Sequence, residues 1–105
     1  MLADALLRES TVDTVCHPAV LLLVREGYKG NVEQGIELVR NLEAYLAYGR
    51  NGRLAAERLF VHRNTLVHRV KMLEDLLGFS LDDLDAQQMR FLETSCMLAL
   101  RESRA

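Results

Sequence analysis

The sequence of 105 residues contains no tryptophan, one proline and two cysteines. So few prolines, together with only six glycines, leave little to interrupt helices, and the abundant alanine, leucine, glutamate and arginine favour them. Two cysteines far apart in the chain, Cys16 and Cys96, do not form a disulfide framework, and a cytoplasmic location is therefore expected. The longest apolar run covers only residues 19–24, too short to span a membrane, so no membrane partner is expected.

Length and hydrophobic pattern together indicate one compact helical domain. Half of the residues are apolar and 27% are charged, which is typical of a folded domain rather than a disordered tail. Residues 2–8 have a loose helical pattern, and residues 11–17 are expected to form a linker because Pro18 disfavours helix before it. Apolar residues at helical spacing predict helices at 18–27, 32–48, 53–60, 63–77 and 84–102. The predicted fold class is all-α, a small helical bundle.

Boundary residues support this division. Asn31 and Asn51 are expected to cap the helices that follow them, and Gly49 and Gly78 to end the helices that precede them. An acidic cluster is interpreted as the cap of the last helix rather than as a catalytic pair or cation site: Asp82, Asp83 and Asp85. All six aromatic residues are expected to be core or half-buried packing residues: Tyr28, Tyr45, Tyr48, Phe60, Phe79 and Phe91.

Charge is unevenly distributed along the chain. The formal net charge is −2, yet residues 50–71 contain six basic side chains and one acidic side chain, Glu57, for a net charge of +5. A positive stretch on an otherwise acidic chain indicates a polyanionic partner. The stretch coincides with a short helix, a tight turn at Val61 and His62, and a longer helix, which is the order of a helix-turn-helix at about 52–78.

The longer helix, about 63–77, has two faces. Leu66, Val70, Leu73 and Leu77 share one side, and the opposite side carries hydrogen-bonding and cationic groups. Four residues are predicted to meet base edges in the major groove: Asn64, Val67, His68 and Lys71. Asparagine suits adenine, and Val67 suits a thymine methyl group. Five residues are predicted to contact phosphates: Arg53, His62, Arg63, Thr65 and Arg69.

The stretch from Arg50 to Gly78 closely resembles the C-terminal helix-turn-helix domain of PucR/CdaR-type transcriptional regulators. The most specific part is Val61-His62-Arg63-Asn64-Thr65-Leu66, followed by Arg69 and Leu76-Leu77-Gly78, and the likeness extends over roughly residues 17–100. Such domains bind DNA at the C-terminus of larger regulators, which carry an upstream sensory or GGDEF-like region and control purine, sugar-diacid and related catabolic operons. The resemblance implies a DNA-binding domain at 17–105 after an N-terminal linker or helix at 1–16.

The resemblance also implies that the chain is a fragment or a stand-alone copy of a regulator whose full-length form carries a sensor domain. Relatives often have an aromatic and a basic residue where this chain has Val67 and His68, so their operator sequences do not transfer. Apolar positions at 18–27 and at Leu98 and Leu100 suggest a homodimer, which would match palindromic half-sites.

Other constellations are less specific. Five residues could be imagined as zinc ligands, but their spacing is unsuitable: Cys16, His17, His62, His68 and Cys96. No metal, no cofactor and no enzymatic activity are expected. Two functions remain: sequence-specific binding of double-stranded DNA as the C-terminal domain of a bacterial regulator, or a helical interaction or dimerisation module whose basic face has no DNA role.

Overall fold

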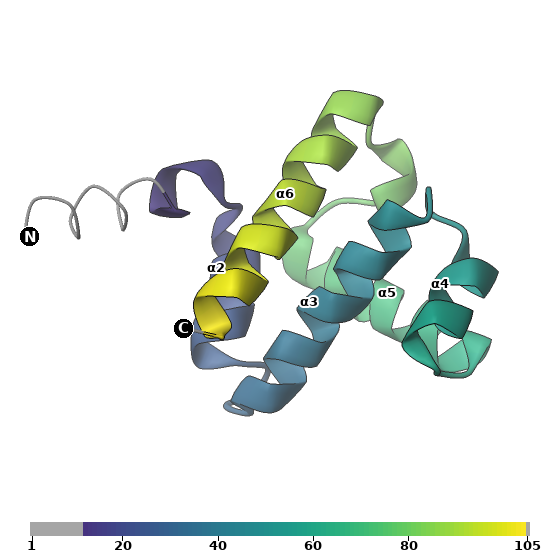
Figure 1. Ribbon diagram of the computed structural model, residues 1–105, viewed down its shortest axis with the longest axis horizontal. Coiled ribbons are helices and arrows are strands. Elements are labelled where there is room, and N and C mark those ends of the chain that lie inside the picture. Colours follow the sequence, from purple (N-terminus) through teal and green to yellow (C-terminus); the bar gives the residue numbers. More distant parts are fainter. Residues whose placement is uncertain (1–11, 105) are drawn as a thin grey trace, which may run out of the picture.

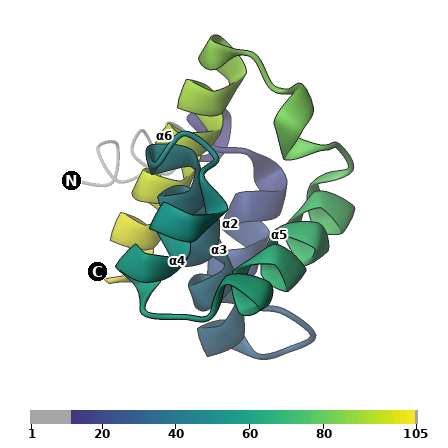
Figure 2. The same cartoon turned by 90° about the vertical axis from the view of Figure 1, so that its right-hand side faces the viewer.

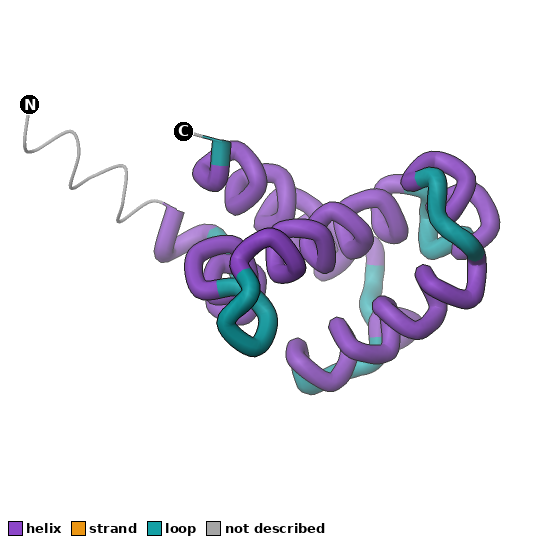
Figure 3. The backbone as a smooth tube through the Cα atoms, turned by 90° about the horizontal axis from the view of Figure 1, so that it is seen from below, coloured by secondary structure: helices purple, strands orange, loops and turns teal. Residues whose placement is uncertain are grey.

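The computed structural model describes residues 12–104, and Figure 1 shows helices joined by short loops. The named elements in chain order are α2 (Pro18–Glu26), α3 (Val32–Ala47), α4 (Gly52–Leu59), α5 (Arg63–Leu77), the 3-10 turn η1 (Leu81–Asp83) and α6 (Ala86–Ser103). Within the described range no strand is present, as the tube in Figure 3 shows. The prediction of a small all-α fold is confirmed.

A bundle of α2, α3 and α6 forms the larger part of the molecule (Figure 1). Its interior contains leucine, valine and alanine side chains from all three helices, among them Val20, Leu42 and Leu92. Leu73 of α5 and Leu81 of η1 reach the same interior, and both are fully buried. The bundle therefore also anchors the second half of α5.

Two glycines allow α2 and α3 to approach each other closely. Gly27 ends α2 with a φ of 87°, a conformation that other residues adopt only with strain. Gly35 lies inside α3, where an added Cβ would overlap the backbone oxygen of Leu23 and the backbone of Gly27. Both positions therefore require a residue without a side chain.

The helix ends follow the predicted caps. Asn31 and Asn51 accept hydrogen bonds from the amides of Gln34 and Leu54, at 3.0 and 3.1 Å. Gly78 adopts the left-handed conformation directly after α5. Of the three aspartates expected to cap the last helix, Asp85 caps α6, with a reciprocal hydrogen bond between its amide and the side chain of Gln88, whereas Asp82 and Asp83 lie in η1. These short-range signals place α4 and α5 close to their predicted bounds.

The linker expected at residues 11–17 is only partly a linker. Residues 12–15 are helical, and the amide of Cys16 donates to the carbonyl of Val12. The amide of His17 donates to the hydroxyl of Ser95 at 3.1 Å, which attaches this segment to α6. The loose helical pattern at 2–8 lies outside the described residues.

Arg25 joins the beginning and the end of the described chain. Its guanidinium lies 3.0 Å from Asp13 and 2.6 Å from Glu102, near the C-terminal end of α6. The hydrogen bond from Arg25 lowers the pKa of Glu102, and the same bond raises the pKa of Arg25. This three-residue link lies at the end of the molecule away from α4 and α5 (Figure 1).

Candidate nucleic-acid interface

The pair formed by α4 and α5 packs on α3 and faces the viewer in Figure 2. The buried residues beneath it form a small cluster: Ala44, Ala55, Ala56 and Leu66. Three of these four are alanines, which lets the backbones of α3, α4 and α5 approach closely. A short helix, a three-residue turn and a longer helix thus adopt the predicted helix-turn-helix order.

His62 fixes the beginning of α5. Its Nδ1 accepts a hydrogen bond from the amide of Asn64 at 3.0 Å, so His62 is the N-cap of the helix. A neutral imidazole that accepts at Nδ1 carries its hydrogen on Nε2. Because His62 is exposed, this Nε2–H is available as a donor at the N-terminus of α5, where the helix dipole also favours anions.

The predicted base-edge residues form one exposed stripe along α5, defined by Asn64, Val67, His68 and Lys71. Their spacing of i, i+3, i+4 and i+7 places them on one face of a helix. Leu66 and Leu73, on the opposite face, have no exposed surface. Within residues 12–104 the side chains of Asn64, His68 and Lys71 have no hydrogen-bond or ion-pair partner, so their polar groups face solvent.

The predicted phosphate contacts have different environments. His62, Arg63 and Arg53 are exposed, whereas Thr65, in the first turn of α5, is half-buried. Arg53 lies 3.5 Å from Glu57, with 67% and 62% of the two side chains exposed. So exposed a pair contributes little to stability, and Arg53 can exchange Glu57 for another anion.

Arg69, for which a phosphate contact is predicted, is held by α3. Its guanidinium turns towards that helix. Its Nη1 lies 3.2 Å from Oδ1 of Asn41 and 3.7 Å from Oε1 of Glu37. The sequence could not indicate this contact, because the partner lies 28 residues earlier in the chain.

Arg50 also uses its guanidinium for contacts within the protein. Its Nη1 donates to three carbonyl oxygens, at 3.0 Å from Leu81, 3.1 Å from Asp82 and 3.3 Å from Leu84. Glu74 accepts a 2.7 Å hydrogen bond from the amide of Leu81 in the same loop. The exposed cations of the basic stretch are therefore fewer than its sequence suggests: Arg53, Arg58, Arg63 and Lys71.

Phe60 corrects the expectation that the aromatic residues pack inside the protein. It is 90% exposed and ends α4 in the left-handed conformation, with a φ of 58°. The chain must reverse at this point, and Val61 turns back inward and donates its amide to Ala56. Tyr48 and Phe91 are also more exposed than expected, at 39% and 48%.

The cysteines and histidines do not form a cluster. Cys16 and Cys96 are both buried, and burial raises the pKa of each thiol, which keeps the thiols protonated. In the described part of the chain no group of three or more histidine, cysteine, aspartate or glutamate side chains could hold a metal ion. A search of the same residues finds no helix that is long and apolar enough to cross a membrane.

Comparison with known proteins agrees with this geometry. The family described as the PucR C-terminal helix-turn-helix domain matches residues 38–92, more than half of the chain. The chain therefore belongs to this family. It is also 34% identical over 65 residues to the proline-responsive transcriptional activator PutR of Bacillus subtilis (strain 168). That match covers 62% of this chain and 16% of the activator. No solved structure matches the chain.

The family and this relative support a DNA-binding role in regulation. The matched residues contain all of α4 and α5 and most of α3. They also contain every residue for which we predicted a base or phosphate contact. Asn41, whose buried amide the sequence does not single out, lies in the same region, as do Phe60 and Arg50, whose positions differ from those expected.

Proposed function

We propose that this chain binds double-stranded DNA sequence-specifically, with α5 in the major groove. The observation that carries the proposal is the exposed stripe of Asn64, Val67, His68 and Lys71. It lies on the side of α5 that faces away from Leu66 and Leu73, in a domain of a helix-turn-helix family. A major groove about 12 Å wide accommodates one such helix.

The chemistry of the stripe suits base recognition. The amide of Asn64 can pair with the N6 and N7 atoms of adenine, and Lys71 can donate to the acceptors of guanine. His68 can donate or accept, depending on its tautomer. Val67, 43% exposed, offers an apolar surface to a thymine methyl group. This combination distinguishes bases, whereas a merely cationic surface does not.

The groups around the N-terminus of α5 suit phosphate binding. His62 and Arg63 present donors at the surface there, Thr65 follows in the first turn of α5, and Arg53 presents a further exposed guanidinium at the beginning of α4. Each phosphate contact contributes about 0.9 to the slope of log affinity against log salt concentration. Binding is therefore expected to weaken steeply as salt increases.

The larger assembly belongs to the same proposal. We propose that the chain acts in the cytoplasm as the C-terminal, non-catalytic domain of a PucR/CdaR-like regulator, with a sensor domain elsewhere in the full-length protein. Homodimers would present two copies of α5 to paired half-sites. Exposed apolar side chains on α2 and α6, including Leu22 at 53%, Phe91 at 48% and Met97 at 54%, support a protein contact made by these helices.

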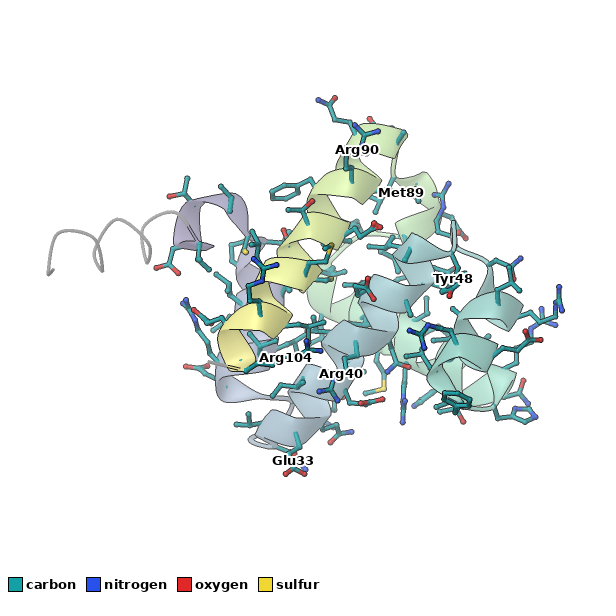
Figure 4. All side chains as sticks on the ribbon, in the orientation of Figure 1. Glu33, Arg40, Tyr48, Met89, Arg90 and Arg104 are labelled. Atoms are coloured by element: carbon teal, nitrogen blue, oxygen red, sulfur yellow. The ribbon has the colours of Figure 1, made fainter. Side chains whose placement is uncertain are left out.

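A competition experiment tests the DNA proposal. The probe is a duplex that the wild-type chain selects from a randomised library, compared with a scrambled duplex of equal length. Replacing Asn64 by alanine should reduce discrimination at its base position by about 1–3 kcal/mol, the range for one good base contact. Arg90→Ala is the matched control, because Arg90 projects from the N-terminal part of α6 and not from α5 (Figure 4).

Two results would count against the proposal. Equal affinity of the wild-type chain for selected and scrambled duplexes would refute sequence specificity. No binding of any duplex at low salt would instead support the alternative of a helical protein-interaction module. Sedimentation at several concentrations measures the homodimer separately, so a monomeric chain would refute that part alone.

A further inference from the structure

Asn41 is a fully buried amide in the middle of α3. Its Nδ2 donates to the carbonyl of Glu37 at 2.6 Å, one turn earlier in the same helix. Its Oδ1 accepts from Nη1 of Arg69 at 3.2 Å, and Arg69 belongs to α5. The side-chain nitrogen of Asn41 therefore bonds within α3, and its side-chain oxygen holds α5.

This hydrogen bond differs in kind from the other contacts that bury α5. Leu66, Val70 and Leu73 pack against apolar neighbours, and such contacts have no preferred direction. A hydrogen bond weakens steeply when its donor and acceptor lose alignment. The Asn41–Arg69 contact consequently resists rotation and sliding of α5 in a way that leucine packing does not.

Rotation of α5 matters for base recognition. Successive residues of a helix are about 100° apart, so even a small rotation redirects every side chain of the exposed stripe. Arg69 follows His68 in the chain and is two residues from Lys71. The contact with Asn41 is thus made next to the residues whose direction would decide recognition.

We infer that Arg69 is a positioning residue, held by Asn41, that sets the angle at which α5 presents its stripe to DNA. The inference rests on the proposed DNA-binding function. It replaces the prediction of a phosphate contact at Arg69, whose side chain is only 29% exposed and is shared between Asn41 and Glu37.

Asn41 makes the inference testable, because a residue with no exposed surface cannot touch DNA. The variants are Asn41→Leu, Arg69→Met and the double variant. Asn41→Ala is the second choice if the leucine variant does not fold. Arg40→Met is the matched control: Arg40 also lies on α3, 3.6 Å from Glu37, but it is half exposed and does not bond to Asn41 (Figure 4).

Three quantities are measured for each variant: affinity for the selected duplex, affinity for the scrambled duplex, and the dependence of both on salt. Circular dichroism establishes the temperature range in which each variant is folded. We expect either single variant to reduce the ratio of selected to scrambled affinity roughly tenfold, the scale of one lost hydrogen bond to a charged group. The double variant should lose no more than either single variant, and the salt slope should be unchanged.

A direct phosphate contact gives a different pattern. Arg69→Met would then weaken binding to both duplexes alike and reduce the salt slope by about 0.9, while Asn41→Leu would leave both affinities unchanged. That result would overturn the positioning role but leave the proposed function intact. A wild-type chain that does not prefer the selected duplex would overturn both. A loss of discrimination in Arg40→Met equal to that in Arg69→Met would also overturn the role of Asn41.

Discussion

The molecule contains two hydrophobic clusters of very different composition. Among residues 12–104, fifteen buried residues form the cluster of the α2–α3–α6 bundle, whereas four form the cluster beneath α4 and α5. In the larger cluster, ten of the fifteen residues are leucines or valines that belong to α2, α3 or α6. The smaller cluster has only one large side chain, Leu66. Most of the buried apolar surface therefore belongs to the bundle, and the helix-turn-helix depends on the bundle for its stability.

α5 connects the two clusters. Leu66, in its first half, belongs to the small cluster, and Leu73, in its second half, belongs to the large one. The N-terminal half of α5 therefore combines weak apolar anchorage with most of the exposed recognition groups. Strong anchorage of the C-terminal half compensates for this.

The largest loss of stability is expected at Leu66, because no other large side chain in the small cluster can replace it. Leu66→Ala should reduce the free energy of unfolding by about 2–5 kcal/mol, because it removes the single large side chain from a fully buried site. Val67→Ala, at the adjacent exposed position, should change it by less than about 0.5 kcal/mol. Urea denaturation measures both, and equal losses would contradict the division of α5 into a buried and an exposed face.

The next largest loss of stability is expected from a glycine substitution in the bundle, compared with one in α4. Gly35→Ala should destabilise the protein by about 1–3 kcal/mol, because the new methyl group would overlap the backbone of α2. Gly52→Ala, in the first turn of α4, meets no atom within 4 Å and should be neutral or stabilising. Thermal unfolding compares the pair, and a tolerated Gly35→Ala would show that α2 and α3 can separate without cost.

A smaller loss of stability is expected on acidification, because the N-cap of α2 is a histidine, His17. His17 caps α2 by accepting from the amide of Ala19 at Nδ1, its ring lies 6.0 Å from that of Phe79, and burial lowers its pKa. A lowered folded-state pKa means that its contribution is complete above about pH 6.5 and is lost as pH falls through the folded-state value.

The loss on acidification should be about 0.5–2 kcal/mol, the range for one N-cap. His17→Asn keeps a capping acceptor that does not titrate, so its unfolding free energy should decline less between neutral pH and pH 5. Urea denaturation at a series of pH values compares the two chains. Parallel pH profiles would show that His17 is not responsible.

The smallest effect is expected at the end of α4. Phe60→Gly removes a left-handed aromatic residue, whose strain costs about 1–2 kcal/mol, but gives the unfolded chain more freedom. The net result should be a stabilisation of up to about 1 kcal/mol in a thermal melt. A destabilised variant would show that Phe60, despite its exposure, makes contacts that hold the turn.

The sequence predicts those parts of the fold that depend on neighbouring residues. Asn31, Asn51 and Gly78 act within a few positions of themselves, and α3, α4 and α5 accordingly begin and end near their predicted bounds. The exposed side of α5 followed from the spacing of its leucines for the same reason. The roles of Asn64, Val67, His68 and Lys71 in base recognition remain predictions.

Long-range hydrogen bonds account for most of what the sequence does not predict. Arg50 and Arg69 count as surface charge in the sequence, but their partners lie 31–34 and 28 residues away. Asn41 is a polar residue within an amphipathic pattern, and only the position of α5 explains its burial. Phe60 was misjudged because apolar spacing does not indicate which residue occupies the left-handed turn.

The link between Asp13, Arg25 and Glu102 has a practical consequence. It holds the last turn of α6 at the opposite end of the molecule from the turn between α4 and α5 (Figures 1 and 3). A fluorophore or a surface tether attached beyond Ser103 would thus lie away from the turn between α4 and α5. Immobilising the chain there leaves the N-terminal end of α5 facing away from the support.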